Sequence, residues 1–126
     1  MVTDDERIVI LREVAAAFNA HDVDAILGFF TDDAVFDSPR GIQRLGTRFV
    51  GKEAVRAAFA ARFAGIPDVH YGEDRHFVAG DRGVSEWRLT GTGLDGNPID
   101  LHGCDLWEFR EGAIARKDSH WKIVEG

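Results

Sequence analysis

The stretch PIDLHGCDLWEFREGAIARKDSHWKIV (residues 98–124) predicts a β-hairpin close to the end of the chain. Two runs of apolar and aromatic residues flank the triplet Arg110-Glu111-Gly112, which has the composition of a turn. The first run, 99–109, carries Asp105 among apolar neighbours, and the second carries a polar centre at Lys117-Asp118-Ser119-His120. We therefore expect this hairpin to hold the ionisable groups that lie in an apolar setting.

Two more strand-like runs precede the hairpin, at residues 69–78 and 84–92. Turn residues separate them, and the pair Asp95-Gly96 that follows the second run is a strong signal for a hairpin connection. Four such runs in succession predict an antiparallel meander.

Helical signals dominate the first half of the chain. Thr3 and Glu6 form a capping box that opens a first helix. Asp22 caps a second, shorter helix, which we expect to place Phe30 on its inner face.

A short strand is expected at residues 34–37, ended by Ser38-Pro39 because proline lacks an N–H. Residues 39–50 are interpreted as a loop, and a third helix is expected over 52–63. Three helices followed by strands predict an α+β fold over residues 1–126, a single domain in which the helices cross a strongly curved sheet and leave a concave pocket.

Composition excludes several classes of function. The 126 residues carry a formal net charge of −7 and contain no basic run, so neither nucleic acid nor an anionic membrane is an expected partner. Cys104 is the single cysteine, the first residues lack the pattern of a signal peptide, and no apolar run approaches a membrane span, so we expect a cytoplasmic protein. No phosphate-binding loop, nucleophile elbow or metal-ligand spacing occurs, and we expect neither a cofactor nor a metal.

The sequence resembles the nuclear transport factor 2-like superfamily, and within it the group of ketosteroid isomerases and SnoaL-like polyketide cyclases. The resemblance is carried by FNAHDVDAILGFFTDDAVFDSPRG (18–41), Gly51-Lys52-Glu53 and CDLWEFREGAIARKDSHWK (104–122), and it extends over nearly the whole chain. It implies a cone-shaped roll, a curved and mostly antiparallel sheet packed on three N-terminal helices. The superfamily includes isomerases, cyclases, dehydratases, epoxide hydrolases and non-catalytic binders, so it specifies the fold better than the reaction.

Ketosteroid isomerases use an aspartate base together with a tyrosine and a protonated aspartate as oxyanion donors. The resemblance places Asp105 on the oxyanion aspartate, Val14 on the tyrosine and Ser38 on the base. Asp37 lies one residue before the base position, and such an offset in a strand turns a side chain to the other face. A true steroid isomerase is therefore not expected.

If Asp105 faces the pocket, strand alternation places Leu101 and Trp107 beside it. By the same superposition we expect further pocket residues on the two neighbouring strands: Glu86, Arg88, Lys117, Ser119 and Trp121. Val14, Phe18, Phe59 and Trp87 are expected as additional ligand-contacting walls. Such a cluster of acids and bases could serve as general acid, general base or anion clamp.

Other interpretations remain open. The cluster could be a buried ion-pair network that only fixes the fold. One bulge would turn Asp118 and His120 inward instead, where the carboxylate could orient the imidazole for base chemistry. Asp37 with Ser38 could lie at the pocket mouth or form an Asx turn before Pro39.

We therefore hypothesise a small, cofactor-independent enzyme that transfers protons on a small, mostly apolar molecule, as an isomerase, cyclase or hydratase/dehydratase. Asp105 is expected as proton donor or base, with Lys117 and Arg88 as polarising cations. The alternative is a non-catalytic module that binds a small ligand or another protein. The resemblance also implies a homodimer through the outer face of the sheet.

Overall fold

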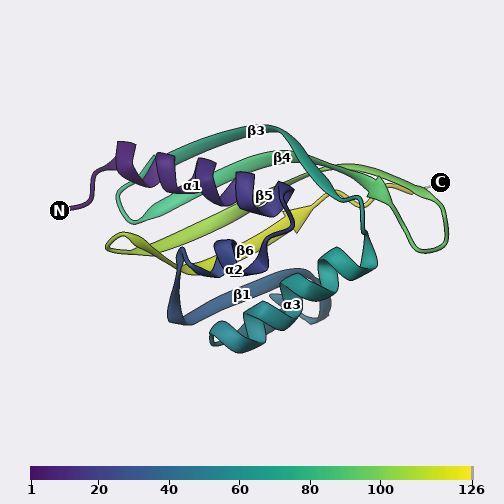
Figure 1. Cartoon of the computed structure of the whole chain (residues 1–126), viewed down its shortest axis with the longest axis horizontal. Helices are drawn as coiled ribbons and strands as arrows, with labels where there is room; N and C mark the ends of the chain where they lie inside the picture. The colour runs from purple at the N-terminus through teal and green to yellow at the C-terminus, as the bar shows by residue number, and fades with distance from the viewer. Residues whose placement is uncertain (126) are drawn as a thin grey trace.

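The structure is a computed structural model that describes residues 1–125, which form three helices and six strands (Figure 1). The helices are α1 (Asp4–Asn19), α2 (Val23–Leu27) and α3 (Lys52–Gly65). The strands are β1 (Phe30–Gln43), β2 (Gly46–Val50), β3 (His70–Ala79), β4 (Arg82–Thr92), β5 (Pro98–Arg110) and β6 (Ala113–Trp121).

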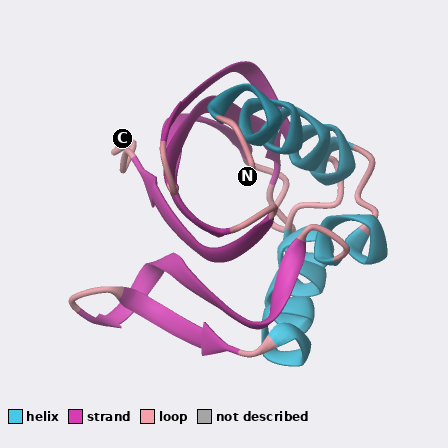
Figure 2. Ribbon diagram, turned by 90° about the vertical axis from the view of Figure 1, so that its left-hand side faces the viewer, coloured by secondary structure: helices cyan, strands magenta, loops and turns pink. Residues whose placement is uncertain are grey.

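All six strands belong to one mixed sheet in the order β2-β1-β6-β5-β4-β3. Every neighbouring pair is antiparallel except β1 and β6, which run parallel. The sheet curls strongly without closing, and the helices lie along its concave side (Figure 2). Helix α1 contacts β3, and α3 contacts β1 and β2. These features confirm the expected α+β cone with three helices.

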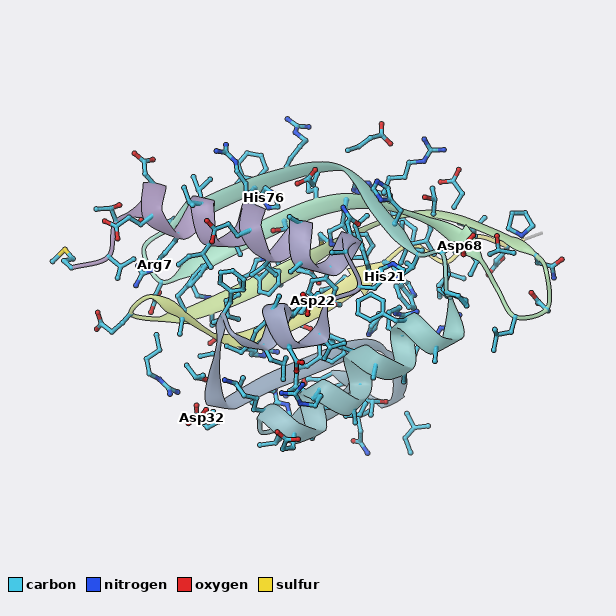
Figure 3. All side chains as sticks on the ribbon, in the orientation of Figure 1. Arg7, His21, Asp22, Asp32, Asp68 and His76 are labelled. Carbon is cyan, nitrogen blue, oxygen red and sulfur yellow. The ribbon has the colours of Figure 1, made fainter. Side chains whose placement is uncertain are left out.

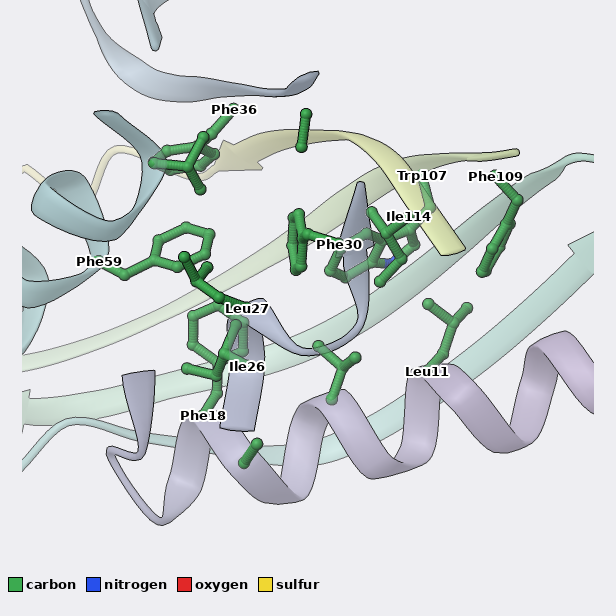
Figure 4. Close-up of a cluster of buried hydrophobic side chains, with 14 residues drawn as sticks. Leu11, Phe18, Ile26, Leu27, Phe30, Phe36, Phe59, Trp107, Phe109 and Ile114 are labelled. Carbon is green, nitrogen blue, oxygen red and sulfur yellow. The ribbon is translucent and has the colours of Figure 1, made fainter. Parts of the chain in front are cut away.

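Aromatic residues join the helices to the sheet (Figure 4). The Phe59 side chain on α3 is 2% exposed, and its ring centroid lies 5.1 Å from Phe18, 5.8 Å from Phe30 and 5.0 Å from Phe36. Ring pairs at such distances add stabilisation beyond the burial of their area. One side chain thereby holds α1, α3 and β1 in fixed positions.

Polar side chains hold the ends of α1 (labelled in Figure 3). The Arg7 guanidinium donates to the carbonyls of Gly80, at 2.8 Å, and Glu111, at 2.9 Å, which lie in two hairpin turns. At the other end, His21 Nε2 lies 2.7 Å from the carbonyl oxygen of Val69, and its ring stacks on Phe63 at 4.5 Å. Both contacts span more than 40 residues of sequence, so they fix the helix across the open side of the sheet.

Three expectations about the region after α2 were wrong. Phe30 begins β1 instead of lying in the second helix, and residues 39–50 form most of a β1–β2 hairpin instead of a loop. Pro39 does not end the strand, because it falls where the β1–β2 register shifts, between Ser38 and Gln43. At such a bulge the missing N–H costs no ladder hydrogen bond.

The last strand is shorter than expected and ends at Trp121, which pairs with Gly103. One further backbone hydrogen bond joins Lys122 to His102, at 2.8 Å, and beyond it Ile123 is exposed. Within the described chain, no helix combines the length and the apolar character needed to cross a membrane.

Candidate active site

A pocket of about 470 Å³ opens between the β1–β2 hairpin, α3 and the concave face of the sheet. A volume of this size is typical of small-molecule sites. Apolar and aromatic residues form most of its wall, with a few polar and charged groups among them. The lining comprises Phe36, Ser38, Pro39, Arg40, Thr47, Phe49, Ala57, Ala58, Phe59, Ala61, Arg62, Gly65, Tyr71, Trp87, Lys117, Ser119 and Trp121.

Lys117 on β6 reaches the inner end of this pocket and is 6% exposed. Its Nζ atom lies between 4.9 and 5.8 Å from the ring centroids of Phe18, Phe36, Phe59 and Trp107. Ring faces attract an ammonium group, but they replace its hydration only in part. Burial lowers the pKa of Lys117, and the attraction of Asp105 opposes that shift.

Asp105 is the carboxylate that compensates this buried cation, and it is 5% exposed. Its Oδ1 accepts hydrogen bonds from Lys117 Nζ, at 2.9 Å, and from the Ser119 hydroxyl. Its Oδ2 accepts from Trp87 Nε1 at 2.9 Å. With three donors directed at it, the carboxylate acts as an acceptor, which fits a positioning role better than that of a proton donor.

The register of β5 and β6 brings these groups together. Asp105 pairs with Ser119 and Trp107 with Lys117, so all four side chains lie on the concave face. Gly103, two residues before Asp105, leaves room for the Trp87 indole, since a Cβ there would lie 2.4 Å from ring atoms. The absence of a side chain at Gly103 is therefore what lets Trp87 reach the carboxylate.

A second, small cavity of about 30 Å³ lies deeper, next to Asp105, Val14 and Phe18. Tyr71 lines both cavities, and burial raises its pKa to about 12, so it remains a neutral phenol.

A polar chain borders the small cavity (His76 is labelled in Figure 3). Trp107 Nε1 donates to Ser85 Oγ at 2.9 Å, and Ser85 Oγ lies 2.7 Å from His76 Nδ1. His76 Nε2 is in turn 2.7 Å from Asp74 Oδ2. This chain links the inner wall to the outer edge at β3.

The expectation that Glu86 and Arg88 share the face of Asp105 was wrong. In the β4–β5 register Ser85 pairs with Asp105 and Trp87 with Gly103, so the alternate positions of β4, Glu86 and Arg88, face outward. Arg88 pairs there with Asp100, at 2.6 Å. Leu101 lies on the concave side but packs with the Trp87 cluster beside the pocket.

Asp37 does not lie at the pocket mouth, because alternation along β1 turns it to the convex face. It is fully buried there, and its carboxylate binds the Arg48 guanidinium through two hydrogen bonds, of 2.8 and 3.0 Å, and Arg116 at 2.7 Å. Burial acts to raise the pKa of Asp37, but these two arginines outweigh it and hold that pKa below its ordinary value. Ser38, the next residue, lines the pocket.

Asp118 and His120 also lie on the convex face, so the alternative in which they point inward was wrong. Asp118 is 3.3 Å from Arg116 and 3.2 Å from the His120 ring. The register shift in the β5–β6 hairpin falls between Glu108 and Phe109, close to the turn. It therefore does not change which face residues 117–120 point to.

Several pocket residues were missed from the sequence: Phe36, Arg40, Phe49, Arg62 and Tyr71. On α3 a signal was present, since Ala58, Ala61, Arg62 and Gly65 recur at helical spacing. Small residues on one helix face leave space when a large partner does not fill it. Among residues 1–125, no group of three or more metal-ligating side chains occurs.

Fold and pocket together define a curved α+β fold with a pocket of the size that small molecules occupy. The sequence profile of the SnoaL-like domain matches residues 11–117, and the chain belongs to this family, within the nuclear transport factor 2-like superfamily. No curated protein sequence matches the chain at a significant level.

Solved structures show the same fold at low sequence identity. A candidate polyketide cyclase from Xanthomonas campestris pv. campestris is 19% identical with a TM-score of 0.85, over 94% of this chain and 92% of that one. TerC, co-crystallised with polyporic acid, is 22% identical with a TM-score of 0.80, over 93% and 92%. A Catenulispora acidiphila protein with a ketosteroid isomerase-like fold, in complex with trimethylamine, is 21% identical with a TM-score of 0.79, over 90% and 85%.

Removing one charge of the buried ion pair should destabilise the protein far more than removing both charges together. We expect Lys117→Met alone to cost about 3–5 kcal/mol, because it leaves the Asp105 carboxylate buried without a cation. Adding Asp105→Asn should recover most of this loss, since the amide oxygen still accepts from Trp87. Urea unfolding of Lys117→Met, Asp105→Asn and the double variant measures the effect. A double variant as unstable as the two single losses added together would contradict the interpretation.

Asp37→Asn should change how stability depends on acid. Because the folded-state pKa of Asp37 is lowered, its ionised form stabilises the fold above the unfolded value of about 4, and this contribution is lost as pH falls through the folded-state pKa. Wild type should therefore exceed the variant in stability at pH 7, and the difference should shrink below pH 4. Chemical unfolding from pH 7 to 2 tests this, with Asp5→Asn, at an exposed aspartate of the first helical turn, as the control. A stability difference between wild type and Asp37→Asn that stays constant from pH 7 to 2 would contradict this assignment.

Proposed function

We propose that this protein is a cofactor-independent enzyme that transfers protons on a small, mostly apolar molecule bearing a carbonyl or hydroxyl group. One observation carries the proposal, namely the position of the Lys117 ammonium at the inner end of an apolar pocket. Two of its N–H bonds go to Asp105, at 2.9 Å, and Ser119, at 2.7 Å. The third has no hydrogen-bond partner among residues 1–125 and is left for a ligand oxygen.

The chemistry follows from the lowered pKa of Lys117. Loss of a proton from Nζ replaces the third N–H bond by a lone pair that faces the pocket. The lowered pKa favours this amine form, which can act as a general base. The amine takes a proton from the carbon next to a carbonyl, an enolate forms, and the resulting ammonium returns the proton to another atom. Asp105 and Ser119 are assigned as positioning residues that hold Nζ in place. Isomerisation, aldol-type cyclisation and dehydration share this first step.

The structural relatives support the binding of a small molecule in this fold, since TerC was crystallised with polyporic acid and the Catenulispora protein with trimethylamine. Steroid isomerisation is not proposed, because Val14 and Ser38 occupy the positions of two of the three groups that reaction uses.

A second candidate function is non-catalytic binding of a small ligand. The observation in its favour is that both oxygens of Asp105 already accept hydrogen bonds from protein groups, which is what a purely structural ion pair would show. The two functions differ in one measurable property, the exchange of substrate protons.

Carbon-bound protons of a suitable ketone should exchange with D2O in the presence of the protein. We expect 2-acetylnaphthalene and other flat methyl ketones to lose their methyl proton signal at least about tenfold faster with wild type than with Lys117→Met/Asp105→Asn, because that variant lacks the base. One-dimensional proton NMR follows the exchange. Exchange at the buffer rate for every ketone would overturn the enzyme proposal, and amide shifts on ligand addition would then favour the binding module.

We also propose a homodimer through the outer face of the sheet. Phe77 pairs with Val84, and Val84 pairs with Leu106, so three apolar residues form a row across β3, β4 and β5. Phe77 is 52% exposed and Leu106 is 40% exposed. A contiguous apolar row of this kind suits a self-complementary contact around a twofold axis.

Leu106→Glu should convert a dimer into a monomer, because it puts a charge into the apolar row, at its β5 end. Sedimentation equilibrium at micromolar concentration measures the mass of wild type and variant. Leu94→Glu, in the β4–β5 turn and 78% exposed, is the matched control and should leave the mass unchanged. A wild-type protein that sediments as a monomer would refute the proposal.

A reducing compartment such as the cytoplasm remains our prediction for the location of the protein. It rests on the single cysteine, Cys104, which is partly buried and carries a free thiol.

A further inference from the structure

The charge of the main pocket is opposite in sign to that of the protein as a whole. The chain carries 22 acidic against 15 basic residues. The pocket lining nevertheless contains three cations, Lys117, Arg40 and Arg62, and no carboxylate. Asp105, next to the pocket, offsets the charge of Lys117 alone. The two arginines therefore give the pocket a positive potential, and such a potential concentrates anions from solution.

Both arginines meet at one side chain near the pocket mouth. Arg40 comes from the β1–β2 hairpin and Arg62 from α3, and their guanidinium carbons lie 5.6 and 4.8 Å from the Trp121 ring centroid. Neither makes an ion pair within residues 1–125, whereas six other arginines in this part of the chain do, namely Arg48, Arg56, Arg75, Arg88, Arg110 and Arg116. Two cations from different elements thus converge without a carboxylate between them.

Stacking on an indole leaves the edge of a guanidinium available. That edge carries N–H donors in a planar fork that matches the two oxygens of a carboxylate. The charge of Arg62 also reaches into the pocket, where it contributes to lowering the pKa of Lys117.

We propose that the pocket selects organic anions, with a flat apolar body between its aromatic walls and a carboxylate held by Arg40 and Arg62. The body would lie against Phe36, Phe49 and Phe59, which line the pocket. This orientation directs the end of the molecule away from the carboxylate toward Lys117. The inference rests on the proposed function for the identity of the site, and it adds the charge of the substrate.

The two arginines could also stack on Trp121 for a purely structural reason, which predicts no preference for anions. Arginine stems and guanidiniums also stack on tryptophan simply to cover apolar surface. In that case the pocket would show no preference for a charged ligand over a neutral one of equal shape.

Binding of 6-acetyl-2-naphthoate and of its neutral methyl ester distinguishes anion selection from purely structural stacking. We expect wild type to bind the carboxylate about tenfold more tightly than the ester, a typical effect of a charge-assisted hydrogen-bonded pair. In Arg40→Gln/Arg62→Gln the preference should fall to about twofold or less, and in wild type it should weaken with added salt. Quenching of tryptophan fluorescence measures both affinities, and circular dichroism verifies that the variant is folded.

Arg44→Gln is the matched control, because Arg44 is an exposed arginine of the same hairpin outside the pocket lining, and it should keep the preference. Equal affinity for the two compounds, tighter binding of the ester, a preference that survives the double substitution, or no binding of either compound at millimolar concentration would overturn the proposal. Binding requires no turnover, so anion selection can hold where proton exchange fails. Conversely, if the methyl protons of the ester exchange with D2O but the protein shows no preference for the anion, the proposed function holds and anion selection fails.

Discussion

The burial of one ammonium group constrains the rest of this structure. Lys117 is surrounded by four aromatic rings at the inner end of a pocket, and Asp105 is the carboxylate that compensates it. A charge removed from water is tolerable only when its partner is also held in place. The Ser119 hydroxyl and the Trp87 indole hold that partner, and Gly103 makes the room that Trp87 requires. The pair therefore depends on three adjacent strands being in the correct register.

Core and pocket share the same side chains. Phe59 packs against rings of α1 and β1 and at the same time lines the pocket, so the wall that would contact a ligand is also what holds the helices on the sheet. Small residues on the adjoining face of α3 leave the space inside the curved sheet that forms the pocket. A site built in this way is rigid at its inner end and open at the β1–β2 hairpin.

Alternation along β1 and β6 separates two charged networks with different properties. On the concave side Lys117 and Asp105 form an isolated pair among apolar groups. On the convex side Asp37 binds Arg48 and Arg116, whose guanidiniums remain partly in contact with solvent. The same few residues of sequence thus supply a functional group to the pocket and an ionic clamp to the outer face.

The sequence by itself determined the features that depend on neighbours along the chain. Helix caps, the final hairpin, and the common face of Lys117 and Ser119 follow from local patterns and from the two-residue period of a strand. Pairing between segments that are far apart was decided only by the tertiary structure. It turned Glu86 and Arg88 outward through the β4–β5 register, made a hairpin of residues 39–50, and brought hairpin and helix arginines together at one indole. These outcomes depend on which strands meet and how far the sheet curls, which no local pattern of residues encodes.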